Sequence, residues 1–446
     1  MNTANTTLER VNSWIRNSVS LKLFIIILIM LLLLIPSEMI KSIISEREEL
    51  RFEAIREVSS KWAENQLING PILSIPVLFE HEEGNKKIQE IKYLKILPDI
   101  LRIKGKIIPT RLKRGIFEVI VYRSEISLNG SFDLNKKFVL NETKLIQYEQ
   151  AFLTLGISDL RGIEEEINLK WENQDLKVES GSKLSPIINS GITAYIREIS
   201  NDTCRKYDFQ LILKLQGSQN LSFIPVGNTT FAELESAWTS PSFNGSFLPD
   251  WRELTEGGFK ASWKILEMNR NFPQYWIEPD PSQYMANTTF GIDLVLPVDD
   301  YQKSMRSAKY AVLTIVLTFL IFFLAEILNG RKIHPFQYGL VGLALCLFYI
   351  LLVSLSEHLK FNLAYLISTF AIITMIVLYS VSVFRKIKLS LVLFVMMISI
   401  YGFLFITLQL ADYALLLGSI GLTVILGLTM YFTRNINWYQ LNVDNE

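Results

Sequence analysis

Long apolar runs interrupt an otherwise polar chain, and their lengths predict a membrane protein with one large soluble part. A helix needs about 20 mostly apolar residues to cross about 30 Å of hydrocarbon. Six runs of that length occupy residues 19–40, 308–328, 336–356, 361–384, 389–410 and 413–432. A polar interval, residues 41–305, separates the first run from the others. The pattern therefore predicts one N-terminal span and a transmembrane bundle of five helices over residues 306–433.

The first apolar run has the basic flank of a signal sequence. Arg10, Arg16 and Lys22 precede the apolar block 23–35. A cleaved signal peptide would need a pattern of small residues after that block, and the chain continues instead with Pro36, Ser, Glu and Met. The sequence therefore favours an uncleaved signal anchor over a cleaved peptide.

The basic residues beside the spans predict the orientation, because short cytoplasmic loops are enriched in Lys and Arg. With the N-terminus inside, the segments on the cytoplasmic side hold Arg10, Arg16, Arg331, Lys332, Arg385, Lys386, Lys388 and Arg434. The short outside loops hold only Lys360. Both polar termini, residues 1–18 and 434–446, are therefore predicted to be cytoplasmic, and the polar interval is predicted to be extracytoplasmic.

A charged segment follows the first span. Leu50, Ala54, Val58 and Trp62 recur every four residues within it, which is the spacing of one helix face. We expect a charged amphipathic helix over residues 41–69, ended by the Asn-Gly-Pro sequence that begins at Asn69.

Beyond that helix the hydrophobic period changes to two, which is the period of a strand with one wet face. The alternation covers residues 126–133, 166–171, 207–215, 259–265 and 290–296. Glycine, proline and asparagine separate these segments, so residues 70–305 are predicted to form a mainly antiparallel β domain. A sandwich and an open barrel both fit the pattern.

The composition agrees with a lipid-embedded part joined to a soluble part. Half of the residues are hydrophobic, 20% are charged, and the mean hydropathy is +0.26. The 44 basic residues balance 44 acidic ones, which excludes the basic excess of a nucleic-acid-binding protein. Cys204 lies in a polar stretch and Cys346 in an apolar run, so they predict neither a disulfide framework nor a metal site.

The chain lacks the common catalytic motifs. It has three histidines and no H-E-x-x-H, G-x-S-x-G, C-x-x-C or P-loop sequence. The nearest imitation is Gly-Ser-Ile-Gly at residues 418–421, whose small residues favour close helix packing over hydrolase chemistry. The sequence predicts no catalytic residue, no cofactor and no metal.

Six ionisable side chains near the predicted membrane boundaries are the candidate functional residues. Glu326, Arg331 and His334 would form an inner group, and Glu357, His358 and Asp412 an outer group. Charged side chains next to hydrocarbon are costly and often have a role, such as proton or substrate transfer. The simpler interpretation is snorkelling with an ion-pair partner for Glu326, for which Arg331 lies nearby, and solvated loops for the outer group.

Several motifs carry a resemblance to a known family. Residues 70–77 read G-P-I-L-S-I-P-V, 158–163 S-D-L-R-G-I, 238–249 W-T-S-P-S-F-N-G-S-F-L-P, 414–418 A-L-L-L-G and 433–439 T-R-N-I-N-W-Y. In these blocks, and at Lys309 to Ala311, Arg331, His334, Pro335 and Ser356 to His358, the chain resembles the CreD family of bacterial inner-membrane, cell envelope integrity proteins. The resemblance runs from about Leu21 to Tyr439.

The resemblance implies an inner-membrane protein that supports envelope integrity and tolerance of envelope stress. It implies no reaction and no cofactor. The leading hypothesis is a non-enzymatic protein that acts through its β domain on envelope proteins or lipids and is held in the bilayer by its six spans. The alternatives are a lipid or small-molecule transporter that uses the C-terminal bundle, and an intramembrane hydrolase. The sequence leaves the oligomeric state open.

Overall fold

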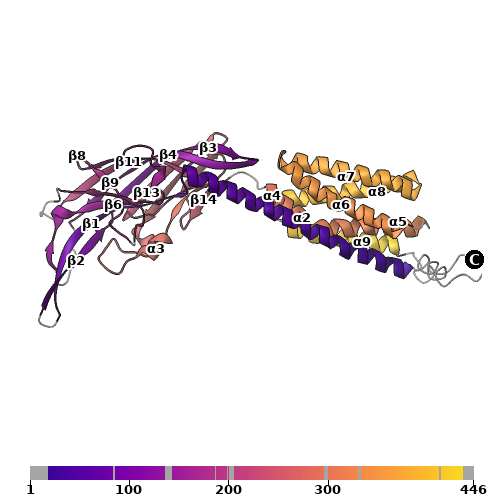
Figure 1. Ribbon diagram of the computed structural model, residues 1–446, viewed down its shortest axis with the longest axis horizontal. Helices are drawn as coiled ribbons and strands as arrows, with labels where there is room; N and C mark the ends of the chain where they lie inside the picture. The colour runs from indigo at the N-terminus through magenta and orange to yellow at the C-terminus, as the bar shows by residue number, and fades with distance from the viewer. Residues whose placement is uncertain are drawn as a thin grey trace, which may run out of the picture. The chain divides into compact units, whose positions relative to one another are not determined.

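The computed structural model divides the chain into two compact units (Figure 1). It describes residues 19–83, 86–135, 143–185, 187–197, 199, 205–295, 300–329, 333–410 and 413–434. The membrane unit comprises Met1–Arg51 and Val298–Glu446, and the β unit is Phe52–Pro297. The division falls inside one continuous helix, α2, which spans Val19–Trp62.

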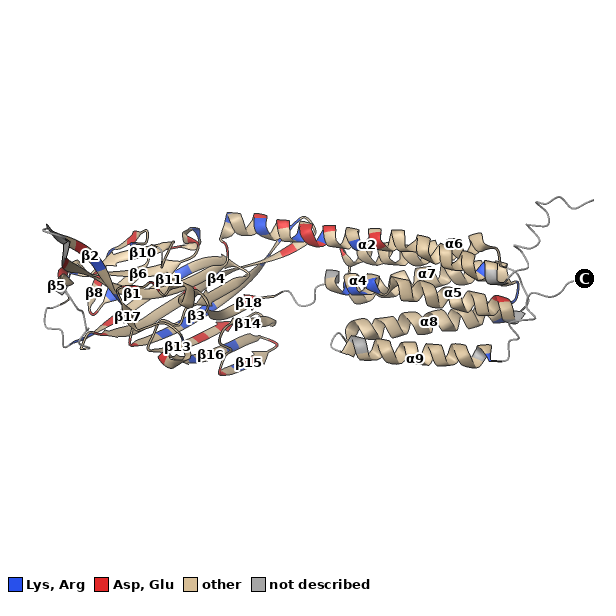
Figure 2. Ribbon diagram, turned by 90° about the horizontal axis from the view of Figure 1, so that it is seen from below, with Lys and Arg blue, Asp and Glu red and all other residues tan. Residues whose placement is uncertain are grey.

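The membrane unit is helical. Besides the first part of α2, its helices are α4 (Asp300–Lys309), α5 (Ala311–Asn329), α6 (Pro335–Ser356), α7 (Phe361–Phe384), α8 (Ile387–Gln409) and α9 (Ala414–Thr433). In Figure 2 the helices α5 to α9 are mostly free of charged residues between their ends.

Within the described residues, four helices are long and apolar enough to cross a membrane: α2, α6, α7 and α8. A fifth span results if α4 and α5, which meet at a bend of 41°, count as one. In α9 the apolar helix Leu416–Tyr431 is shorter. A multi-span membrane part is therefore confirmed, whereas the number of six spans stays a prediction.

The core of the membrane unit is aromatic. The ring of Phe348 on α6 packs edge-on against Tyr349, Tyr365 and Tyr401, with centroid distances of 4.8, 5.5 and 4.8 Å. The Tyr365 hydroxyl donates to the Tyr401 carbonyl oxygen at 2.8 Å, which gives a buried polar group a partner. These contacts join α6, α7 and α8.

The helix after the first span ends earlier than the sequence predicted. It stops at Trp62, and strand β1 begins at Gln66, so the Gly70–Pro71 pair lies within a strand. The register of β1 against β6 shifts between Asn69 and Ile72, and such a bulge tolerates a proline that cannot donate a hydrogen bond. Pairing with distant strands, rather than the local helix-stop residues, determines the end of the helix.

The β unit contains two mixed sheets. The ten-stranded sheet consists of β1 (Gln66–Glu83), β2 (Lys86–Ile96), β5 (Thr143–Ile146), β6 (Phe152–Ile157), β9 (Val178–Ser180), β10 (Gly191–Tyr195), β12 (Asn220–Phe223), β14 (Pro241–Gly245), β17 (Tyr275–Trp276) and β18 (Phe290–Leu294). The eight-stranded sheet consists of β3 (Ile100–Arg114), β4 (Phe117–Asp133), β7 (Asn168–Trp171), β8 (Gln174–Leu176), β11 (Lys206–Ser218), β13 (Thr229–Ser236), β15 (Trp251–Thr255) and β16 (Gly258–Leu266).

Most described strand pairs are antiparallel, and β1 with β12 and β3 with β13 are parallel. One hydrophobic core lies between the sheets, and it includes Leu73 of β1 and Leu128 of β4. The rings of Trp263 on β16 and Phe290 on β18 meet across it at 5.6 Å. Two sheets that face each other over one core form a sandwich, which decides between the two predicted alternatives.

The alternating segments of the sequence are strands with one buried face. Along β11, Tyr207, Phe209 and Leu211 are buried while Asp208 and Gln210 are exposed. The end of α2 also packs as its spacing predicted, since Val58 and Trp62 contact the buried Val119 and Val121 group of β4, although Leu50 is exposed.

Candidate functional site

Glu326 of α5 is a buried carboxylate with a cationic partner on another helix. It is 9% exposed and forms an ion pair with Lys22 of α2. It also accepts hydrogen bonds from the Tyr338 hydroxyl and the Ile333 backbone N–H, both at 3.0 Å. The sequence pointed to Arg331 as the ion partner, and Arg331 lies outside the described residues.

His334 does not contact Glu326 by any described interaction, and its role is structural. Its Nδ1 accepts from the Phe336 backbone N–H at 3.2 Å, and its own backbone N–H donates to the Gln337 side chain at 3.0 Å. These reciprocal bonds cap the first turn of α6. Among the described residues, Lys22 and Tyr338 are therefore the side-chain partners of Glu326, and the grouping of Glu326 with Arg331 stays a prediction.

Two members of the predicted outer group, Glu357 and His358, lie within the described residues. Glu357, at the end of α6, lies 3.3 Å from Nε of Arg47 on α2, and its side chain is 14% exposed. The neighbouring His358 is exposed, and its backbone N–H donates to the Leu355 carbonyl oxygen. Asp412 lies outside the described residues. The structure thus gives Glu357 a partner on α2 instead of bringing it to His358.

The two ion pairs hold the same helix at two levels. Lys22 and Arg47 are separated by 25 positions on α2, which corresponds to about 38 Å at 1.5 Å per residue. This length exceeds the hydrocarbon thickness of about 30 Å. Each pair can therefore lie near one boundary of the bilayer, with the apolar part of α2 between them.

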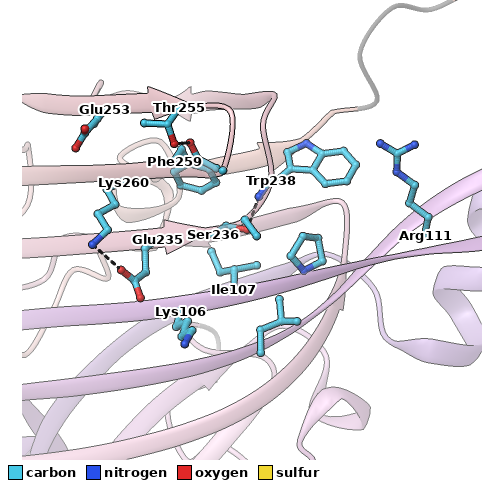
Figure 3. A pocket seen from close by; sticks show the side chains of 15 residues that line it. Lys106, Ile107, Arg111, Glu235, Ser236, Trp238, Glu253, Thr255, Phe259 and Lys260 are labelled. Atoms are coloured by element: carbon cyan, nitrogen blue, oxygen red, sulfur yellow. Dashed lines mark hydrogen bonds and ion pairs between the residues drawn. The ribbon is translucent and has the colours of Figure 1, made fainter.

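The outer face of the eight-stranded sheet has a groove that no sequence pattern indicated (Figure 3). One part of it has a volume of about 610 Å³ and is lined mainly by β3, β13 and β16, with Trp238 beyond the end of β13. An adjoining hollow of about 600 Å³ includes Trp251. Both hollows are lined by Lys106, Glu235 and Lys260, so they are neighbours, and we refer to the two together as the groove.

Most charges in the groove are paired across strands. Lys260 lies 3.3 Å from Glu235, and Lys104 lies 3.6 Å from Glu233. Both pairs are largely exposed, and each contributes at most about 1 kcal/mol to the stability of the fold. A charged group of a ligand can therefore replace either partner at a small cost in free energy. The Lys106 ammonium forms no ion pair or hydrogen bond with any side chain in the described part of the chain.

Asp159 holds the junction between α2 and β1. Its carboxylate accepts two hydrogen bonds from the Arg161 guanidinium, at 2.9 and 2.7 Å, and one from the Glu64 backbone N–H at 2.9 Å. Arg161 also donates to the Ser60 carbonyl oxygen at 2.6 Å. These contacts tie the last turn of α2 and the link to β1 to the turn that follows β6.

Comparison with known proteins identifies the family. The model of the family described as "Inner membrane protein CreD" matches residues 18–439. The chain belongs to the CreD family. The inner membrane protein CreD of Escherichia coli (strain K12) is 32% identical over 419 residues, covering 93% of this chain and 92% of the relative. Together with the apolar helices, this makes the chain a multi-pass inner-membrane protein.

The CreD-like motifs of the β unit have structural roles. In S-D-L-R-G-I, Gly162 has no room for a side chain, since a Cβ there would collide with the Gln216 carbonyl oxygen. In the segment that begins at Trp238, the indole N–H donates to the carbonyl oxygens of Ser240 and Val295, both at 3.1 Å, beside the β14–β18 pair. Both observations are packing contacts within the β unit.

Two solved structures of an M1 zinc metallopeptidase from Deinococcus radiodurans show a distant likeness. One is of a point mutant, with 7% identity and a TM-score of 0.20, and the match covers 44% of this chain and 42% of that one. The other has 8% identity and a TM-score of 0.18, with coverages of 37% and 38%. Likeness at this level carries no argument about fold or function.

The Gly-Ser-Ile-Gly segment of α9 has no hydrolase-like geometry among the described residues. The Ser419 hydroxyl donates to the Leu416 carbonyl oxygen of its own helix at 2.8 Å. A Cβ at Gly421 would collide with the Phe403 ring of α8, so this glycine allows the two helices to approach closely. Gly418 has no such neighbour.

Proposed function

We propose that the protein supports the integrity of the cell envelope and its tolerance of stress without catalysing a reaction. In this proposal the β unit lies in the periplasm, both termini are cytoplasmic, and the β unit engages an envelope component. The resemblance to the CreD family supplies the envelope role, and the basic residues at the span ends support the orientation.

The groove on the eight-stranded sheet is the observation that carries the proposal. It combines exposed aromatic surface, with Trp251 53% exposed, and charges that can exchange partners. Binding surfaces commonly combine aromatic anchors with polar groups that fix orientation. Lys106 lines both hollows and adds an ammonium group that a partner's acceptor can reach.

A complementation experiment tests the proposal. Deletion of the gene in its source organism should raise sensitivity to detergent and to cell-wall antibiotics, and the wild-type gene should restore tolerance. A groove variant, Lys106→Glu with Trp251→Ala, should fail to restore it at equal protein level by immunoblot.

The matched control changes one exposed cation and one exposed aromatic residue elsewhere, Lys170→Glu with Tyr284→Ala, and should complement fully. Unchanged tolerance after deletion would remove the envelope role. Full complementation by the groove variant would leave the envelope role standing and would show that the groove is not needed for it.

A further inference from the structure

Helix α4 carries a concentration of positive charge directly before a membrane helix. The helix contains Lys303, Arg306 and Lys309, and the one acidic residue in its sequence, Asp300, is at its N-terminal end. Tyr310 alone separates α4 from α5, and the two helices meet at 41°. The charges therefore lie directly before the apolar helix α5.

One face of α4 packs against the other helices of the membrane unit. Ser304, Ser307 and Ala308 are each at most 2% exposed. Beside this face, Lys303 donates to the Gln409 side chain of α8 at 3.2 Å, and Gln409 in turn donates to Asn362 of α7 at 2.7 Å. These contacts fix α4 against the ends of α7 and α8, at the membrane boundary.

The opposite face presents a cationic ridge, Arg306 and Lys309. At 100° per residue, both point about 150° away from the centre of the buried face. Lys309 is exposed and Arg306 is half-buried, and neither side chain forms an ion pair or hydrogen bond with any group in the described part of the chain. Two unpaired cations next to hydrocarbon need a counter-charge that the described protein does not supply.

We propose that the ridge of Arg306 and Lys309 binds the phosphate headgroups of anionic phospholipids in the leaflet next to α4. A basic face on an amphipathic helix at the bilayer surface is attracted to anionic lipid, and each basic residue adds to the binding. The half-buried stem of Arg306 can lie along apolar surface while its guanidinium reaches the headgroup level. The inference holds whichever leaflet this is, so it does not depend on the proposed function.

Photocrosslinking tests the site directly. Purified full-length protein is placed in nanodiscs that contain a trace of phosphatidylglycerol or phosphatidylcholine with a photoreactive headgroup. Adducts on residues 302–310 are then measured by peptide mapping. The wild type should be labelled preferentially by phosphatidylglycerol, and Arg306→Gln with Lys309→Gln should reduce that preference about tenfold.

Two controls separate the alternatives. Lys170→Gln with Lys177→Gln removes two exposed cations of the β unit and should leave labelling of α4 unchanged, whereas Arg306→Lys should retain most of the preference because the charge remains. Equal labelling by both lipids, or an unchanged preference in the double Gln variant of correct size on gel filtration, would overturn the proposal. Loss of labelling on adding millimolar inorganic phosphate at constant ionic strength would assign the ridge to a soluble anion and overturn it as well.

Discussion

The Asp159 carboxylate is held by a cation two positions further along the chain, Arg161, and by backbone N–H groups. The hydrogen bonds from Arg161, together with those from backbone N–H groups, lower the pKa of the Asp159 carboxyl to about 2 from an ordinary value of 3.8. A pKa that is lower in the folded state adds stability above the ordinary pKa, and that stability is lost as the pH falls from about 4 to about 2.

Asp159→Asn should therefore destabilise the β unit at pH 7. The Arg161 side chain is 56% exposed, so solvent screening limits the loss to about 1 kcal/mol, or about 3 °C in melting temperature. The difference from wild type should shrink as the pH is lowered towards 3. Thermal unfolding of the full-length protein in detergent, followed by tryptophan fluorescence, measures both values.

Asp175→Asn, at an exposed carboxyl of β8, is the control for this change and should have little effect. A difference between Asp159→Asn and wild type that is the same at pH 7 and pH 3 would contradict the assigned role of the charge.

At the scale of elements, α2 is fixed to the bundle by two ion pairs of unequal burial. Lys22 and Glu326 have side-chain exposures of 16% and 10%, whereas Arg47 is 43% exposed beside Glu357. Removal of one partner from a buried pair leaves an uncompensated charge and costs about 3–5 kcal/mol. Loss of an exposed pair costs about 1 kcal/mol or less.

Lys22→Met should therefore destabilise the membrane unit far more than Arg47→Met. Unfolding of the purified protein in mixed micelles by increasing SDS, monitored by circular dichroism, compares the two variants. Similar midpoints for both would mean that the Lys22 pair is solvated to the same degree as the Arg47 pair.

The elements with a clear hydrophobic period were predictable from the sequence, and long-range partners were not. Alternation identified β11 and β16 because one face of each strand is wet. Just after the end of α2, Glu64 contacts Asp159, 95 positions away, and the partner of Glu326 is 304 positions away. The sequence did not predict the groove, because Lys104, Lys106 and Lys260 occupy alternate positions along their strands, as polar residues do on any exposed strand face.

At the scale of the whole molecule, the distribution of basic residues predicts the orientation in the bilayer. Reporter fusions at Asp133 and Lys264 should be active on the periplasmic side, and fusions at Lys386 and at the C-terminus on the cytoplasmic side. Alkaline phosphatase and green fluorescent protein fusions, normalised to expression, make the comparison. A cytoplasmic signal at Asp133 and Lys264 would contradict both the orientation and the proposed function.

The two ion pairs of α2 join residues that are synthesised at very different times. Both cations are made at the start of synthesis, whereas Glu326 and Glu357 follow the complete β unit. The ten-stranded sheet closes late as well, since β12 pairs with β1 and with β18, the last strand before α4. The nascent chain must therefore keep its first helix in the membrane with Lys22 and Arg47 unmatched until α5 and α6 are inserted. Retention of that helix during synthesis therefore cannot depend on either ion pair.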